Sequence, residues 1–533
     1  MRRVLLLLFL FTCAAAGAYA QTFESGGIQY SVLSSDDKTV AVERYCGDSV
    51  GNVIIPQTVR FDDEYAVKEI KGSAFYCCRG LSSISIPDGV TSIGYSAFMF
   101  CGGLTSIHIP KSVTSIKSDA FSYCDGVTSI TVDPQNPMFD SREDCNAIIE
   151  TSTNTLFTGC KNTVIPKSVT KIGSSAFCGC SGLTALTIPD GVTSIGFYSF
   201  RECNGLTSID IPASVSLIDQ YAFMWCAGLV SVNIPEGVAS IRGSAFWGCS
   251  ALKSVKIPAS VSNIETEAFG NCRSLASIVV DPANTKYDSR KKCNAIIETA
   301  TNTLIAGCKN TVIPKDVTCI GLRAFFGCSD LSKVTIPDGV TKLEFEAFRD
   351  CSSLKKIKIP SSVTEIGPSV FYDCDGLTAI TVSKKNLTFD SREKCNAIIE
   401  TASNTLIQGC KNTVIPKSIA KIGPQAFARI SGLTSIIIPD GVTGIRHNAF
   451  EVCRNLTSIT IPSSVTEIEF GVFSGCSSLT QVVSKIEKPF GFELNPFRDI
   501  SDDCVLTVPA GTHSAYIAAG WTEEIFKGGI IEE

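Results

Sequence analysis

Cysteine is the residue type in this chain with the most chemistry to offer. The sequence has 25 cysteines, and thirteen of them stand three residues after a Phe at one position of a repeated unit. Five follow at intervals of 23 residues: Cys180, Cys203, Cys226, Cys249 and Cys272. A metal site needs several ligands at short spacing, whereas this series supplies one thiol per unit. Because cysteine packs as a small apolar residue and Ile430 fills the same position, we interpret these cysteines as core residues and predict no metal or other cofactor.

Six further cysteines lie in pairs about three short polar turns. The pairs are Cys145 with Cys160, Cys293 with Cys308, and Cys395 with Cys410. In an antiparallel hairpin, residues equidistant from the turn lie opposite each other, and an exported protein can oxidise such a pair. Directly opposed cysteines strain a disulfide bridge, however, so the oxidised and the free state both remain open.

An Asp-Ser-Arg tripeptide occurs three times and resembles a catalytic motif at first sight. Its copies begin at Asp140, Asp288 and Asp390. A serine nucleophile needs a base, and the three histidines of the chain, His108, His447 and His513, are not repeated with the motif. Asp133 and Asp140 also suggest calcium, but the third repeated segment has Ser383 where the first has Asp133, so it lacks the first of the two carboxylates. We predict structural turns, in which Asp bonds local amides, and no enzyme activity.

The outward positions of the repeated strands are the expected working surface. A column of Ser residues and a neighbouring variable column follow the chain, one residue of each per unit. Three lysines fall together in adjacent units without an acid among them, which makes them a candidate anion contact. The candidate partner-binding residues on this face are Lys333, Lys356, Lys358, Asp210, Asn233 and Lys256.

A sequence repeat predicts the strands and turns that position these residues. Leu206-Thr-Ser-Ile-Asp-Ile-Pro212 returns as Leu229-Val-Ser-Val-Asn-Ile-Pro235, and the period is 23 residues. A fixed period of this size indicates a solenoid, in which each unit buries its apolar face only against its neighbours. Alternation such as Ile107-His108-Ile109 predicts short strands with Ile inward, and the following Pro ends each strand. We expect a right-handed coil of short parallel strands with irregular or short helical turns, hairpin inserts and terminal caps.

The chain divides into four segments along this pattern. Residues 1–20 read as a signal peptide, with Arg2-Arg3, an apolar run and Ala18-Tyr19-Ala20 before the cleavage site, while Cys13 raises a lipoprotein alternative. Residues 21–77 are expected to form an N-terminal cap with a first degenerate repeat, residues 78–476 the solenoid, and residues 477–533 a C-terminal cap. Doubled units are expected at 124–180, 272–328 and 374–430. No second apolar stretch is long enough to span a membrane.

The charge balance bears on possible partners. The formal net charge is −6, and loss of Arg2 and Arg3 with the leader leaves 44 basic and 52 acidic residues, a net charge of −8. A dispersed acidic balance argues against a nucleic acid as a partner.

The unit at residues 81–101, L-x-x-I-x-I-P-x-x-V-x-x-I-G-x-x-A-F-x-x-C, resembles the BspA-like class of leucine-rich repeats, the bacterial surface-antigen type. The general leucine-rich pattern expects Asn or Cys where this unit has Gly89, and Val90 follows it as in the BspA-like class. The resemblance implies adhesion to host extracellular protein, matrix or glycan. We therefore expect an exported non-enzymatic binding protein, on the cell surface, secreted or periplasmic. The alternative is a self-associating structural component of the cell envelope.

Overall fold

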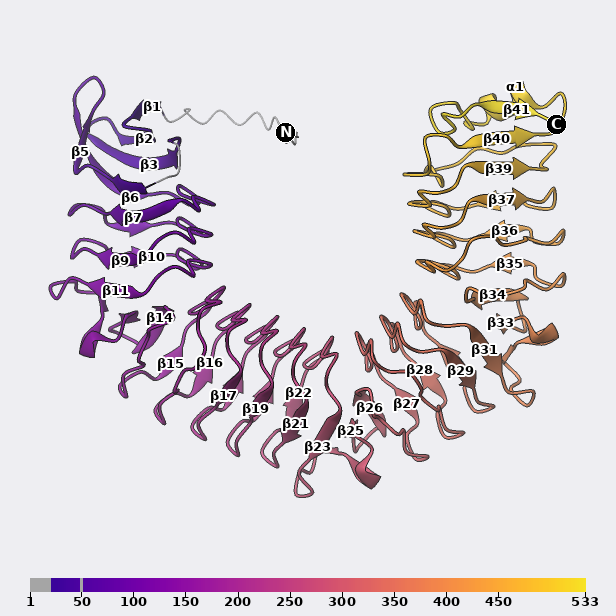
Figure 1. Cartoon of the computed structure of the whole chain (residues 1–533), viewed down its shortest axis with the longest axis horizontal. Coiled ribbons are helices and arrows are strands. Elements are labelled where there is room, and N and C mark those ends of the chain that lie inside the picture. Colours follow the sequence, from indigo (N-terminus) through magenta and orange to yellow (C-terminus); the bar gives the residue numbers. More distant parts are fainter. Residues whose placement is uncertain (1–20, 48–50) are drawn as a thin grey trace. The chain divides into compact units, whose positions relative to one another are not determined.

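The computed structural model describes residues 21–47 and 51–533. The chain divides into two compact units, one ending at Ser141 and one beginning at Arg142. Within each unit the strands of successive turns lie side by side (Figure 1). The expected signal peptide and Cys13 lie outside the described residues.

The turn at residues 206–226 shows how one repeat folds. Strand β17 (Ser208–Asp210) buries Ile209 between two exposed residues, and Pro212 follows its end because proline has no N–H for a ladder. Strand β18 (Leu217–Ile218) is the short second strand, and an irregular bend then returns the chain to the core at Cys226. The predicted strand, proline stop and irregular turn are confirmed.

Parallel pairing at an offset of 23 residues joins each turn to the next. Ser208, Ser231, Ser254 and Ser277 are successive partners in one sheet, and Ile195, Ile218, Ile241 and Ile264 are successive partners in the other. We call the first strand of each turn the leading strand and the second the trailing strand. The coil of parallel strands predicted from the sequence period is therefore confirmed.

The second unit contains most of these strands. Its leading strands are β17, β19 (Ser231–Asn233), β21 (Ser254–Ile257), β23 (Ser277–Val280), β29 (Lys356–Ile359), β31 (Ala379–Val382), β37 (Ser458–Ile461), β39 (Gln481–Ser484), β40 (Val505–Val508) and β41 (Ile530–Glu532). Its trailing strands are β15 (Lys171–Ile172), β16 (Ser194–Ile195), β18, β20 (Ser240–Ile241), β22 (Asn263–Ile264), β27 (Cys319–Ile320), β28 (Lys342–Leu343), β30 (Glu365–Ile366), β35 (Lys421–Ile422), β36 (Gly444–Ile445) and β38 (Glu467–Ile468).

The first unit begins with antiparallel strands, which pass into the parallel coil. Strands β1 and β2 and strands β2 and β3 pair antiparallel, and β3 then pairs parallel with β6. The elements are β1 (Thr22–Ser25), β2 (Ile28–Ser34), β3 (Thr39–Tyr45), β4 (Gly51–Ile54), β5 (Thr58–Arg60), β6 (Glu64–Ile70), β7 (Leu81–Ser85), β8 (Ser92–Ile93), β9 (Ser106–Ile109), β10 (Ser115–Ile116), β11 (Ser129–Val132) and β12 (Phe139–Asp140).

Each doubled unit carries a β-hairpin in place of an ordinary turn. The hairpin strands are β13 (Ala147–Glu150) with β14 (Thr155–Gly159), β25 (Ile296–Glu298) with β26 (Thr303–Ala306), and β33 (Ile398–Glu400) with β34 (Thr405–Gln408). Short strands and 3₁₀ turns lead into them: η1 (Arg142–Asp144), β24 (Tyr287–Asp288), η2 (Arg290–Lys292), β32 (Phe389–Asp390) and η3 (Arg392–Lys394). The second arm of each hairpin rejoins the coil, since β26 pairs parallel with β27.

The hairpins separate the core of the second unit into consecutive clusters. Ile296 and Cys308 pack with the cluster before the second hairpin, whereas Cys293, Ile297 and Leu304 pack with the cluster after it. A stack of buried Phe rings runs through each cluster. Phe200, Phe223 and Phe246 have ring centroids 5.0 and 5.1 Å apart and nearly parallel planes.

The register cysteine does more than fill space. Buried thiols donate to the carbonyl oxygen of the stacked Phe in the preceding turn, as from Cys249 Sγ to Phe223 O at 3.2 Å. Cys328 follows a hairpin and donates instead to Gly307 O, at 3.7 Å. In the third doubled unit Ile430 replaces the cysteine, and Gln408 Nε2 donates to the equivalent Gly409 O at 3.0 Å. The hydrogen-bond donor that is lost with Ile430 is thus replaced by the side-chain amide of Gln408 on the hairpin.

The C-terminal end closes with an aromatic cluster around Trp521, which Phe497 and Phe526 contact. Helix α1 (His513–Ala518) packs Tyr516 into this cluster. Within the described ranges, no helix is long and apolar enough to cross a bilayer.

The thiol donors can be tested by removing one. Cys249→Val replaces the thiol by an apolar side chain that is slightly larger and leaves Phe223 O without its partner, so we expect a loss of about 1–2 kcal/mol in the free energy of unfolding, measured by urea denaturation. Gln408→Leu should cost a similar amount for the same reason. Ile430→Val is the control at a position that donates nothing, and it should cost only the buried methylene, about 1 kcal/mol or less. A Cys249→Val protein as stable as the wild type would contradict this account.

Candidate binding faces

The residues expected on the outward strand face form two separate groups. In the first group, Asp210 and Asn233 are partners in adjacent strands, β17 and β19, and both are exposed. Lys256 lies in the next turn on β21, where its Nζ is 3.2 Å from Asp281 Oδ2. The amide of Ala283 and then Lys256 lower the pKa of Asp281. The charge of Lys256 therefore already has a partner.

The second group is basic and lacks such partners. Lys356 and Lys358 alternate on strand β29, so both point outward, and Lys333 lies in the preceding turn. The two turns are joined by Ser353 N, which donates to Ser329 O at 3.0 Å. In the described part of the chain, none of the three lysines has a carboxylate within 4 Å. The three lysines therefore lie on two adjoining turns, whereas Asp210 and Asn233 lie on other turns of the same unit.

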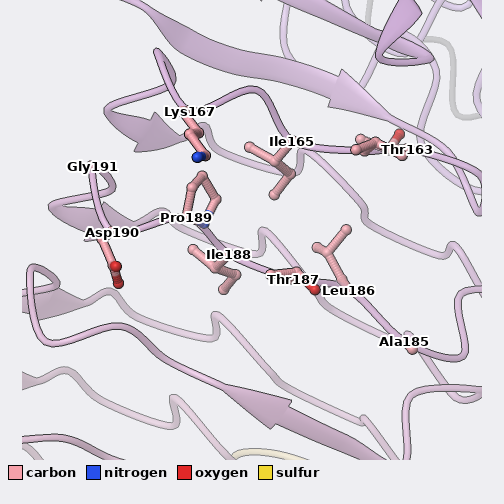
Figure 2. Close-up of a pocket in the computed structure, with 11 residues that line it drawn as sticks. Thr163, Ile165, Lys167, Ala185, Leu186, Thr187, Ile188, Pro189, Asp190 and Gly191 are labelled. Atoms are coloured by element: carbon pink, nitrogen blue, oxygen red, sulfur yellow. The ribbon is translucent and has the colours of Figure 1, made fainter.

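The ladder of leading strands is interrupted after the first doubled unit, and a groove opens there. Residues 183–188 run extended without a strand partner, and a groove of about 670 Å³ lies between residues 163–167 and residues 185–191. Ile165 and Leu186 point toward one another across it (Figure 2). The charged side chains in its lining are Lys167 and Asp190. Of the hydroxyl groups in the lining, that of Thr163 donates to Asn146 O at 2.6 Å.

A third set of outward side chains flanks the stacked Phe residues, and sequence analysis did not single it out. These side chains are partly exposed and come from several bends of the second unit. We call them the aromatic–arginine band: Phe197, Tyr198, Arg201, Tyr221, Trp225, Trp247, Arg323, Phe326, Phe345, Arg349, Tyr372 and Arg429.

The bends hold this band in fixed positions. Tyr221 and Trp225 have φ values of +59° and +61°, in the left-handed region that non-glycine residues seldom occupy. Backbone hydrogen bonds between turns stabilise these conformations, for example from Trp225 N to Trp247 O at 2.7 Å. The large side chains are consequently presented by rigid backbone and not by loose loops.

Aromatic contacts form the first half of the band. The rings of Tyr198 and Tyr221 stack at 4.9 Å, and the Arg201 guanidinium lies 4.9 Å from the Tyr198 ring centroid. Trp225 and Trp247 meet edge to face at 4.4 Å. Such rings offer large, rigid and amphipathic contact area.

Arginines and carboxylates form the second half. Glu346 is only 5% exposed and accepts from Arg323 Nε and from an Arg349 terminal nitrogen, each at 2.6 Å. Arg323 also pairs with Glu267. The Arg349 guanidinium lies 5.0 Å from the Tyr372 ring centroid. Since each arginine is held both by a carboxylate or ring and by its own bend, the band is preorganised.

Two partly buried carboxyl groups, those of Asp350 and Asp373, lie beside these arginines and have raised pKa values. Asp350 and Asp373 occupy equivalent positions in adjacent turns, 23 residues apart, both with positive φ. Burial, and after it the charge of Asp350, raises the pKa of Asp373 to about 6. Arg349 and Arg429 oppose this shift. Burial likewise raises the pKa of Asp350.

The pair predicts a dependence of stability on pH. The pKa of Asp373 is higher in the folded chain than its ordinary value of 3.8, so its contribution to stability is full below about pH 4 and is lost as the pH rises through 6. Asp373→Asn removes the buried charge, and Asn tolerates the positive φ. We expect this variant to melt about 1–3 °C above the wild type at pH 8 and at the same temperature near pH 4, by calorimetry.

The exposed Asp440 provides the control for this experiment. Asp440→Asn should leave the melting temperature unchanged at both pH values. An Asp373→Asn effect of equal size at pH 4 and pH 8 would mean that the carboxyl group does not titrate as described.

The Asp-Ser-Arg motifs are structural turns, as predicted. Asp288 Oδ1 accepts from the backbone N–H and the guanidinium Nε of Arg290, at 3.0 and 2.8 Å. Ser289 Oγ accepts from Val280 N at 2.9 Å, so the hydroxyl group ties the turn to strand β23. Among the described residues, no group of three or more His, Cys, Asp or Glu side chains is arranged to hold a metal ion.

The hairpin cysteines do not lie directly opposite each other. A bulge between Ile296 and Ile297 shifts the register by one residue, so Cys308 Sγ donates to Asn294 O at 3.3 Å. Cys293 is on the other side of the hairpin, in the next core cluster. The same shift occurs in the other two hairpins. Cys293, Cys308, Cys395 and Cys410 are free thiols in the structure.

Alkylation would establish the state of these four thiols in the protein. Burial raises the pKa of Cys293 and of Cys395 to about 11, so little thiolate forms near neutral pH and iodoacetamide should react slowly with the folded chain. After denaturation without reductant, we expect one label on each of the four thiols by mass spectrometry. Unlabelled peptides linked as Cys293–Cys308 or Cys395–Cys410 would show that the bridges form.

The band could have been recognised from residue types alone. The two positions between each ladder Phe and its register Cys hold large side chains such as Met224-Trp225 and Tyr372. An exposed bend ordinarily carries small or polar residues.

The arrangement defines a repeat protein of the β-solenoid class, with a packed interior and outward columns of side chains. A profile of BspA type leucine-rich repeat regions matches residues 43–143, 150–276, 303–403 and 400–488, well over half of the chain. The chain therefore belongs to the BspA-type leucine-rich repeat family. No curated protein matches it in sequence.

Several solved structures are similar to it. One is a leucine-rich cell surface protein from Faecalibacterium prausnitzii, 27% identical over 87% of this chain and 95% of that chain, with a TM-score of 0.40. A leucine-rich repeat protein from Bacteroides ovatus is 23% identical over 89% and 99%, with a TM-score of 0.35. The pneumococcal vaccine antigen PcpA is 13% identical over 96% and 99%, with a TM-score of 0.28.

Proposed function

We propose that this protein is an exported, non-enzymatic binding protein of the bacterial cell surface, and that it holds a protein partner outside the cytoplasm against the aromatic–arginine band. The family supports a surface location, and the leader expected at residues 1–20 supports export. The observation that carries the proposal is the rigid presentation of partly exposed Trp, Tyr and Arg on several bends of the second unit. These three residue types dominate the energetic centres of protein interfaces.

Adhesion to a host is the function that this proposal favours. The ring of Trp247 contacts the rings of Trp225 and Phe326. The guanidinium groups of Arg323 and Arg349 lie over the Phe326 ring. A partner that covers this area would bury several aromatic rings at a low entropic cost, because few side-chain torsions remain to be fixed. An extracellular matrix protein is the partner class implied by the family resemblance.

The test uses the mature chain, residues 21–533, and a panel of immobilised extracellular matrix proteins. Trp247→Ala should weaken capture by the bound matrix protein tenfold or more, the effect typical of an interface hot spot. Val279→Ala is the matched control, since Val279 is also partly exposed but lies on the strand face. Circular dichroism must show that both variants fold. Equal loss in both variants, or none in either, would contradict a role of the band.

Self-association into an envelope structure is the second candidate, because the same rings could meet a second copy. Sedimentation of the mature chain over a range of concentrations separates the two. Concentration-dependent polymers that Trp247→Ala abolishes, without capture by any matrix protein, would favour the structural role. A monomer that binds a matrix protein supports the adhesin.

A further inference from the structure

We propose that the outward strand face at β29 binds an acidic polysaccharide, a linear glycan that carries sulfate or carboxylate groups. The site is a lysine field on adjacent turns, separate from the aromatic–arginine band. Its members are Lys333, Lys355, Lys356, Lys358, Lys384 and Lys385, all exposed. The proposal retains three of the residues expected from the sequence and leaves out Asp210, Asn233 and Lys256.

Printed backbone contacts place the members of the field close together. Strand β29 pairs in parallel with β31, with Lys356 opposite Ala379 and Lys358 opposite Thr381. After β31 the chain bends back over the end of β29, because Ser383 N donates to Ile359 O at 2.9 Å. The buried Asn386 fixes this bend through two hydrogen bonds from Nδ2, to Pro360 O and Val363 O. Lys384 and Lys385 are thereby held beside the end of the strand that carries Lys358.

The positive charge of the field is not neutralised by the protein. Among the described residues, none of its six lysines has a carboxylate within 4 Å, whereas Lys256 pairs with Asp281 and Lys309 with Asp330. The chain as a whole has a net charge of −6. A cluster of unpaired lysines attracts anions from solution, because like charges on adjacent strands repel each other and a bound anion relieves that repulsion.

The geometry suits an extended chain with regularly spaced charges. Lysines two residues apart on a strand are separated by about 6.6 Å, and neighbouring strands by about 4.8 Å. Lysine binds an anion as a flexible point charge and does not demand the bidentate geometry of arginine. Ser332, Thr335 and Thr381 are exposed on the same turns, and their hydroxyl groups can bond sugar hydroxyls, that of Thr381 as an acceptor because it donates to Ile357 O.

Nucleic acid and membrane fit this face less well. Single-stranded nucleic acids bind to aromatic platforms on which bases stack, and the leading strands of these turns carry no aromatic or arginine side chain outward. A lipid surface would need apolar side chains to enter the headgroup region. Leu387, two residues after Lys385, and Ile437, in a later turn, are both exposed apolar residues, so the experiment includes them.

The test measures binding of a sulfated glycan of the heparin type to the mature chain at several salt concentrations. Replacing Lys333, Lys356 and Lys358 together by Gln should weaken binding at least tenfold and reduce the slope of log affinity against log salt by about two. The matched control replaces Lys117, Lys171 and Lys485 by Gln, which removes the same charge from other exposed positions. The control should bind as the wild type does.

Three outcomes would overturn the proposal. The first is an equal loss in the control variant, which would mean that net charge alone drives binding. The second is equal competition by single-stranded DNA. The third is tighter binding to vesicles of anionic phospholipid, lost in a Leu387→Ser, Ile437→Ser variant, which would identify a membrane contact instead. The result does not depend on the function proposed for the band, because Trp247→Ala should bind the glycan normally and the lysine variant should bind the matrix protein normally.

Discussion

The structure depends on one constraint: no turn can satisfy its own backbone or cover its own apolar side chains. Each depends on a neighbour 23 residues away, through the parallel ladders, the stacked Phe rings and the thiol that donates to a Phe carbonyl. A buried carbonyl without a donor is costly, and this explains both the regularity of the cysteine and the form of its exception. Where Ile430 stands, Gln408 supplies the missing hydrogen.

The same constraint frees the outward residues. Because the interior alone fixes the register, the outward positions can differ from turn to turn without disturbing the coil. The bends carry Trp, Tyr and Arg in one region, and the leading strands carry lysine in another. Two surfaces of different chemistry are thus built on one scaffold, which accords with function residing in outward side chains and not in the fold.

Most of the fold could be predicted from the sequence, because the period itself encodes it. Ile209 buried, Pro212 after the strand and hairpins in the doubled units all follow from spacing and local chemistry. The offset between Cys293 and Cys308 in the hairpin could not be predicted from the sequence. It arises from a one-residue bulge, and a run such as Ala295-Ile296-Ile297 gives no sign of one. The donor role of the register cysteine was also missed, since burial explained that residue without it.

The candidate binding faces were only partly predictable. Alternation identified Lys356 and Lys358 as outward residues, but the ion pair of Lys256 with Asp281 depends on a bend in three dimensions. The aromatic–arginine band arises from left-handed conformations at positions such as Trp225, which a residue of that type seldom adopts alone. Pairing between turns imposes these conformations, so the residue types between each Phe and its register Cys indicate the band but not the conformations that present it.

The partition of the core by hairpins has a consequence for how such genes change. The segment of chain between one hairpin and the next contains a complete hydrophobic cluster of its own. The boundary lies within the hairpin, since Cys293 and Cys308 pack in different clusters. The near-identical hairpin segments, Cys-Asn-Ala-Ile-Ile-Glu-Thr at residues 145, 293 and 395, are natural sites for recombination. Unequal exchange there would lengthen or shorten the protein by whole blocks, and would reshuffle its outward surfaces in one genetic step while every junction kept its packing.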